Sequence, residues 1–299
     1  MPAQRERLAV RDFEVVAPDG VVLHARSAGT GPTVLLVHGL GYAAWAGAPL
    51  RNHLVGAGFR FVAFDNRGTG RSEKPAGPYT IAQLAEDARS VVEAVGEGPI
   101  HVIGYSMGGY VALQLALSRP SLVRSLTLIA TSAGGPGARD VPAGTRRAWE
   151  AASGGSPEEF ARATMPLSFR PGWADSHPES FEALLRARLE TPTPRYAWKA
   201  QYDASAQHLH RGLDVTGIRV PALVLHGTRD KVVPHANGVL LAHQLPHARL
   251  RSLDGAGHLS WLEDPSTVAA EIVHFLSEIS PLPAGGTPQP RKRGHPSPN

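Results

Sequence analysis

Short apolar segments that alternate with helical patterns are the feature that most constrains the fold of this chain. Three of them, "TVLLV", "SLTLIA" and "ALVLH", are apolar almost throughout, as is typical of strands buried on both faces of a sheet. Strands that alternate with helices predict a mostly parallel sheet with helices on both faces. We expect eight strands, at residues 13–17, 21–26, 33–37, 60–64, 100–105, 125–130, 222–226 and 249–253. The first two are close enough in sequence to pair antiparallel at one edge, so the predicted fold class is α/β.

Helical patterns fill several of the intervals between these strands. They lie at about residues 80–95, 107–118, 235–245 and 266–279. The interval 132–214 contains no convincing strand, and its helix-like pieces carry many aromatic residues. An insertion of this kind commonly shapes a substrate pocket. The predicted organisation is an α/β core at 1–131 and 215–280, a helical cap at 132–214, and a disordered, Pro-rich basic tail at 281–299.

Composition and charge exclude several classes of function. The chain of 299 residues contains no cysteine, which excludes disulfides, zinc thiolate sites and a cysteine nucleophile. The net charge is +4, but the tail holds three of the 30 basic residues and no acidic one. The rest of the chain therefore has 27 basic and 26 acidic residues. A nearly neutral body offers no electrostatic footprint for nucleic acid, and no apolar run has the length of a membrane span. We therefore expect a cytoplasmic protein with no nucleic-acid or membrane partner, whose oligomeric state the sequence leaves open.

One serine stands at the junction of a strand and a helix, in Gly104-Tyr105-Ser106-Met107-Gly108. This is the pattern G-x-S-x-G, preceded by the apolar run "PIHVIGY" and followed by "GGYVALQLALSR". A sharp turn at this point lifts the serine Oγ away from the backbone, and glycines let the strand and the helix pass closely. The pattern predicts that Ser106 is a nucleophile.

A serine hydroxyl is a weak nucleophile at neutral pH, so a base and an orienting acid are needed elsewhere in the chain. His258 lies in the glycine-bracketed loop "DGAGHLSW" after the last predicted strand, and Asp230 follows the strand "ALVLH". The order Ser106, Asp230, His258 is one of the known orders of a Ser-His-Asp triad. Asp254 is a weaker candidate for the acid because it is too near His258 in sequence.

The negative charge that develops on an attacked carbonyl oxygen needs two N–H donors. One is expected to be the Met107 amide, at the start of the helix after Ser106, where unpaired amides favour an anion. The other is expected to be the Leu40 amide in "VHGLGY", where Gly39 and Gly41 let the backbone swing toward the site. His38 is expected to be structural and to hydrogen-bond this loop.

These motifs together resemble those of the α/β-hydrolase superfamily, over residues 8 to 280. The segments "HG", "FDNRGTGRS", "GYSMGG", "HGTRDKVVP" and "GAGHLSWLEDP" follow the third, fourth, fifth, seventh and eighth strands in that family's order. The resemblance implies an eight-stranded α/β-hydrolase sheet with a cap inserted after strand 6. It also implies a Ser106-His258-Asp230 triad and an oxyanion hole at Leu40 and Met107. Thr69 departs from the family pattern, since many relatives have histidine there, but Asp65, Arg67 and that turn are usually structural.

The resemblance is greatest to the esterase and 3-oxoadipate enol-lactonase branch, which implies hydrolysis of small, mostly apolar carboxylic esters or lactones without a cofactor or metal. Carbon–carbon hydrolases of ring-fission products, cofactor-free haloperoxidases and non-catalytic ligand-binding members of the fold remain as alternatives. A pocket rich in aromatic residues is expected to prefer uncharged acyl groups. The expected pocket residues are Trp45, Tyr105, Phe169, Trp173 and Trp198.

Overall fold

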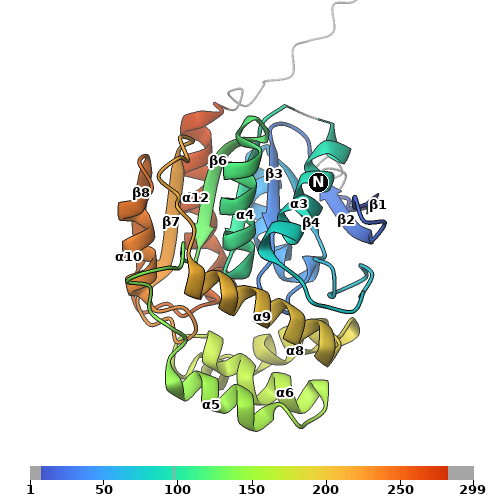
Figure 1. The fold of residues 1–299 in the computed structure, drawn as a ribbon, viewed down its shortest axis with the longest axis vertical. Helices are drawn as coiled ribbons and strands as arrows, with labels where there is room; N and C mark the ends of the chain where they lie inside the picture. Colours follow the sequence, from blue (N-terminus) through green and yellow to red (C-terminus); the bar gives the residue numbers. More distant parts are fainter. Residues whose placement is uncertain (1–7, 97, 282–299) are drawn as a thin grey trace, which may run out of the picture.

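The computed structural model describes residues 8–96 and 98–281, which contain one eight-stranded sheet (Figure 1). The strands are β1 (Arg11–Val16), β2 (Val22–Ala28), β3 (Thr33–Val37), β4 (Arg60–Phe64), β5 (Ile100–Tyr105), β6 (Val123–Ile129), β7 (Ala222–Gly227) and β8 (Ala248–Leu253). Their order across the sheet is β1-β2-β4-β3-β5-β6-β7-β8. β1 pairs antiparallel with β2, and β2 with β4, whereas every other pair is parallel. The predicted mostly parallel α/β sheet is confirmed.

Helices cover both faces of the sheet. Those of the core are α2 (Ala48–Ala57), α3 (Ile81–Val95), α4 (Met107–Ser118), α10 (His235–Gln244), α11 (Ser260–Glu263) and α12 (Pro265–Ile279), with the short 3₁₀ helices η1 (Ala44–Gly47) and η2 (Pro120–Leu122). Leu84 of α3, Leu113 of α4 and Leu241 of α10 belong to one buried cluster. Leu50 of α2 and Phe275 of α12 belong to a second cluster. The two clusters give each face of the sheet its own apolar core, which is why its central strands are apolar throughout.

The segment between β6 and β7 forms a layer of helices across one end of the sheet (Figure 1). These cap helices are α5 (Ala143–Ala152), α6 (Pro157–Thr164), η3 (Met165–Ser168), α7 (Trp173–Ser176), α8 (Pro178–Glu190) and α9 (Arg195–Arg211). They lie at the end toward which the β6 arrow points in Figure 1, the carboxyl end of the parallel strands. Ligands of open α/β sheets bind at that end. The exact limits of the cap, 132 and 214, stay a prediction.

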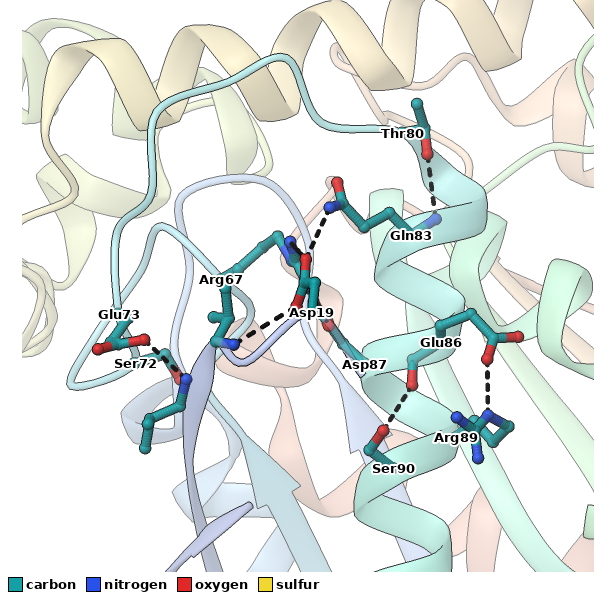
Figure 2. A network of polar contacts seen from close by, with 12 residues as sticks. Asp19, Arg67, Ser72, Glu73, Thr80, Gln83, Glu86, Asp87, Arg89 and Ser90 are labelled. Carbon is teal, nitrogen blue, oxygen red and sulfur yellow. Dashed lines mark hydrogen bonds and ion pairs between the residues drawn. The ribbon is translucent and has the colours of Figure 1, made fainter. Parts of the chain in front are cut away.

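A buried ion-pair network fixes the loop after β4 (Figure 2). The Arg67 guanidinium donates two hydrogen bonds of 2.6 Å to Asp87 of α3 and two, of 2.7 and 3.1 Å, to Asp19 in the β1–β2 turn. Asp87 is fully buried, and burial raises its pKa although the hydrogen bonds and charge of Arg67 oppose the shift. The expectation that Arg67 is structural agrees with these contacts, which tie the loop to two neighbouring elements.

None of the helices in the described residues is long and apolar enough to cross a membrane. The predicted tail, beyond Pro281, lies outside the described residues.

Candidate active site

Ser106 lies in the turn between β5 and α4, in a backbone conformation that side chains rarely adopt. Its φ is +52°, in the left-handed region that costs free energy for a residue with a Cβ. Its amide donates to the Ile129 carbonyl over 2.9 Å, and its carbonyl accepts from Gly109, which holds the turn. A Cβ at Gly104 would lie 2.5 Å from the Gly108 carbonyl oxygen, and one at Gly108 would lie 2.1 Å from that of Val37. Only glycine therefore permits this close approach of β5, α4 and β3.

The structure brings Ser106, His258 and Asp230 together. In the sequence, Ser106 and His258 are 152 residues apart, and Asp230 and His258 are 28 residues apart. Nε2 of His258 lies 3.1 Å from Oγ of Ser106, and Nδ1 lies 2.7 Å from Oδ2 of Asp230. The three residues follow β5, β8 and β7, whose carboxyl ends meet at the same edge because the strands are parallel. An ionised carboxylate can only accept, so Nδ1 carries the proton and Nε2 is free to accept the serine proton.

Asp230 is held in place by more than its histidine. Its Oδ1 accepts from the Val232 and Val233 amides over 2.8 and 2.9 Å, and its Oδ2 lies 3.3 Å from Nε2 of His226. Burial by itself raises the pKa of Asp230, but the charge of His258 and the hydrogen bonds from His226 and His258 outweigh burial and lower that pKa to about 2. The acid is therefore a fixed carboxylate at neutral pH. Sequence reasoning missed His226, whose position four residues before Asp230 gave no signal of this contact.

A buried carboxylate joins the loop of His258 to the cap. Oε1 of Glu263 accepts from the Gly257 amide over 3.0 Å and from the Arg170 amide over 2.7 Å. The Leu259 amide also donates to the Ser168 carbonyl over 2.8 Å. Burial raises the pKa of Glu263, and its two backbone hydrogen bonds oppose the shift. The position of His258 thus depends on contacts with the η3–α7 segment of the cap.

The expected oxyanion loop lies against the serine. A Cβ at Gly39 would stand 2.7 Å from the Tyr105 ring and 3.1 Å from Cβ of Ser106, so glycine is required for the loop to approach. The Gly41 amide donates to Oε1 of Gln201 over 2.9 Å, and Nε2 of Gln201 donates to the Arg67 carbonyl over 2.9 Å. Gln201 comes from the cap helix α9 and is fully buried. Sequence reasoning missed it, since a glutamine in a polar helix carries no motif.

The predicted hydrogen bonds of the His38 ring are not found. The ring is fully buried, and neither of its nitrogens has a hydrogen-bond partner among the described residues. Burial lowers the pKa of His38 to about 4, so the ring is neutral at pH 7. The loop is held instead through the His38 carbonyl, which accepts from the Asn66 side chain over 3.0 Å.

A cavity of about 270 Å³ opens at Ser106 and His258, and we call it the catalytic pocket. Of the residues predicted for the substrate pocket, Tyr105 and Trp198 line this cavity. Leu40 and Met107, the predicted oxyanion donors, also border it, and their role as donors stays a prediction. Trp45, Phe169 and Trp173 do not line it, so the prediction was wrong for these three. Phe169 and Trp173 stack on each other at 4.2 Å and are almost fully buried, because they anchor the cap to the core. Trp45 packs beside the Tyr42 ring at 5.7 Å.

The lining of the catalytic pocket also includes charged side chains. Arg146 of α5 and Arg188 of α8 both line it, together with Asp140. The Arg188 guanidinium lies 5.1 Å from the centre of the Tyr42 ring, a cation–π contact beside the oxyanion loop. The expected preference for uncharged acyl groups stays a prediction. Among the described residues no group of three or more His, Cys, Asp or Glu side chains could hold a metal ion.

Comparisons with known proteins identify the family of this chain. A family model described as the alpha/beta hydrolase fold matches residues 32–265, and the chain belongs to that family. The chain is 30% identical to a putative carbamate hydrolase of Azorhizobium caulinodans, over 84% of this chain and 93% of that protein. It is also 30% identical to a 2-hydroxymuconate semialdehyde hydrolase of Pseudomonas putida, over 85% of this chain and 90% of that protein. The enol-lactonase of Burkholderia xenovorans has a similar structure, with a TM-score of 0.76, 28% identity, and coverage of 89% of this chain and all of that one.

Proposed function

We propose that this protein is a serine hydrolase that cleaves carboxylic esters or lactones through an acyl-enzyme. The observation that carries the proposal is the unbroken chain of hydrogen-bond distances from Ser106 Oγ through the His258 ring to Asp230. A serine so placed is activated by the adjacent base, and the acid holds the base in the required tautomer.

In the first half of the reaction, Oγ of Ser106 attacks the ester carbonyl while Nε2 of His258 takes its proton. The amides of Leu40 and Met107 stabilise the oxyanion of the tetrahedral intermediate. Collapse of the intermediate breaks the bond to the leaving alcohol, which receives the proton from His258. The carboxylate of Asp230 stabilises the imidazolium that forms between these two proton transfers.

In the second half, a water molecule enters and His258 takes its proton while the oxygen attacks the acyl carbon. The acid product leaves and the proton returns to Ser106, so the enzyme is regenerated with one water consumed. A lactone follows the same steps, except that the leaving alcohol remains part of the product.

Similarity to the enol-lactonase of Burkholderia xenovorans supports an ester or lactone bond as the substrate. The size of the pocket supports a small acyl group, since about 270 Å³ lies just below the roughly 300–1,000 Å³ typical of small-molecule sites.

The test is turnover of p-nitrophenyl acetate by the parent protein and by Ser106→Ala. We expect the substitution to lower kcat by up to about 10⁶-fold, as when a triad serine is removed from a protease. Ser205→Ala is the matched control, because Ser205 lines the same pocket but its hydroxyl donates to the Gln201 carbonyl instead of a histidine. A fluorophosphonate probe should label the parent and not Ser106→Ala. Equal turnover by parent and Ser106→Ala would refute the proposal.

A further inference from the structure

The cap contains a second cavity, of about 420 Å³, that we call the cap chamber. It lies among α5, α6, α8 and α9, and residues such as Ser153, Thr193 and Arg195 line it without reaching the catalytic pocket. Six residues line both cavities, namely Arg146, Trp149, Phe160, Arg188, Trp198 and Tyr202. The two cavities are therefore neighbours that share one wall.

The shared wall is mostly aromatic. Trp198 stacks on Tyr202 at 5.3 Å, and the rings of Trp149 and Phe160 meet Trp198 edge-on at 6.1 and 5.3 Å. All four side chains are only half-buried although they lie between cap helices, because part of each ring borders the cavities. Such rings offer flat apolar surface to a hydrocarbon chain or a ring that passes between the two cavities.

The charges around the cap chamber are mainly positive. Its lining contains four cationic and two anionic side chains, and Lys199 and Asp203 neutralise each other at 2.6 Å. Within residues 8–96 and 98–281, no carboxylate lies within ion-pair distance of Arg146, Arg188 or Arg195. The one remaining acid in the lining is Glu150. Three guanidinium groups thus face a cavity with an apolar wall and have capacity to bind an anion, for which their planar donors suit a carboxylate.

Resting on the proposed function, we propose that the cap chamber binds the part of the substrate that is distant from the scissile bond. That part is an apolar chain or ring that ends in a carboxylate. The ester group lies at Ser106, the chain crosses the wall at Trp149 and Trp198, and the carboxylate lies near Arg146 and Arg195. The substrate class is therefore a half-ester of a dicarboxylic acid.

The kinetic test compares two esters of equal chain length, p-nitrophenyl hydrogen suberate and p-nitrophenyl octanoate, which differ in a terminal carboxylate. We expect a higher kcat/KM for the suberate ester than for the octanoate ester. Arg146→Gln should lower the ratio of these two kcat/KM values by about fivefold, which is the range of a partly exposed ion pair. Arg147→Gln is the matched control, because Arg147 is the adjacent exposed arginine of α5 and lines neither cavity. Raised salt should reduce the parent's ratio.

A second variant tests the chamber itself. Thr193→Phe adds a ring to the lining of the cap chamber alone. The ring takes space that the substrate chain would occupy, and one methylene in an apolar pocket is worth about 10–200-fold, so we expect kcat/KM for the suberate ester to fall about tenfold relative to p-nitrophenyl acetate. Thr191→Phe is its control, from the same loop but from neither cavity. Equal ratios for Arg146→Gln and Arg147→Gln, or for the two threonine variants, would overturn the proposal.

Binding without turnover separates this proposal from the proposed function. Ser106→Ala is titrated with monomethyl suberate in a calorimeter, alone and combined with Arg146→Gln or Arg147→Gln. We expect the Arg146 variant to weaken binding by about fivefold and the Arg147 variant to leave it within twofold, by the same ion-pair reasoning. If the parent cleaves no p-nitrophenyl ester, ester hydrolysis is refuted while this titration still decides the binding site. Equal affinities for the two arginine variants would refute the binding site even in an active esterase.

Discussion

Gln201→Leu is expected to damage both the stability and the catalytic rate of this protein. Gln201 is fully buried, and its side chain joins the Gly41 amide of the oxyanion loop to the Arg67 carbonyl of the β4 loop, each over 2.9 Å. Leucine has nearly the same size but can make neither hydrogen bond. The substitution therefore leaves one backbone donor and one backbone acceptor buried without their present partner.

The magnitude follows from these two groups. An unsatisfied buried polar group costs about 1–3 kcal/mol, and the added apolar burial of leucine offsets part of the total. We expect the free energy of unfolding to fall by about 2–4 kcal/mol, a large share of the roughly 5–15 kcal/mol of a typical domain. Gly41 has a φ of +70°, which glycine adopts without strain, so its bond to Gln201 selects one of the several loop conformations open to a glycine.

The catalytic effect arises from the neighbouring Leu40 amide, an expected oxyanion donor. Complete loss of one such donor lowers kcat by about 10²–10³-fold, and we expect displacement of the loop to lower it by roughly tenfold. KM should change little, since Gln201 does not line the catalytic pocket.

The assay combines urea unfolding with the kcat for p-nitrophenyl acetate. Gln207→Leu is the control, because Gln207 lies on the same helix and is exposed. A Gln201→Leu protein with unchanged unfolding free energy would refute the hydrogen-bond reasoning. A destabilised protein with kcat within twofold of the parent would show that the Gly41 contact does not position the oxyanion hole.

Three further predictions concern the triad acid and the ion-pair network. Asp230→Asn should lower kcat by about 10⁴-fold with little change in KM, because the asparagine side chain favours the wrong tautomer of His258. Steady-state kinetics that show most of the activity retained would contradict the assignment of Asp230 as the triad acid. The pKa of Asp230 is lowered from its ordinary 3.8 to about 2, so its contribution to stability is present above pH 3.8 and is lost as the pH falls toward 2. Urea unfolding at pH 5 and pH 3 should therefore show a smaller pH-dependent loss in Asp230→Asn than in the parent, and equal losses would argue against the shift. Asp87→Ala should reduce the unfolding free energy by about 3–5 kcal/mol, since it leaves the Arg67 charge buried with Asp19 alone. Glu93→Ala is the control, because it breaks an exposed ion pair with Arg89 on the same helix, and it should reduce the unfolding free energy by under about 1 kcal/mol. Similar losses for these two variants in chemical unfolding would contradict the assignment of a buried network.

The features that the sequence determined are those with a local physical cause. A strand buried on both faces must be apolar throughout, so "TVLLV" and "ALVLH" identified β3 and β7 directly. A serine with φ of +52° between packed elements needs glycines at fixed offsets, so the elbow was readable from five residues. Because parallel strands end at one edge of the sheet, the order of motifs also placed Asp230 and His258 near Ser106. The helix α2 was missed because its sequence, with proline near the start and glycine near the end, has only a weak apolar stripe.

The features that only the tertiary structure decided depend on which way a side chain points between packed helices. Phe169, Trp173 and Trp198 are all large aromatics of the cap, yet the first two fill the core and the third borders two cavities. Nothing within the cap sequence distinguishes these positions, because the direction of each ring is set by how the cap helices pack on the sheet and on one another. The same holds for Gln201 and Arg188, which reach the oxyanion loop from about 150 residues away in sequence, since such contacts are made by the packing of α8 and α9 and leave no periodic or local signal.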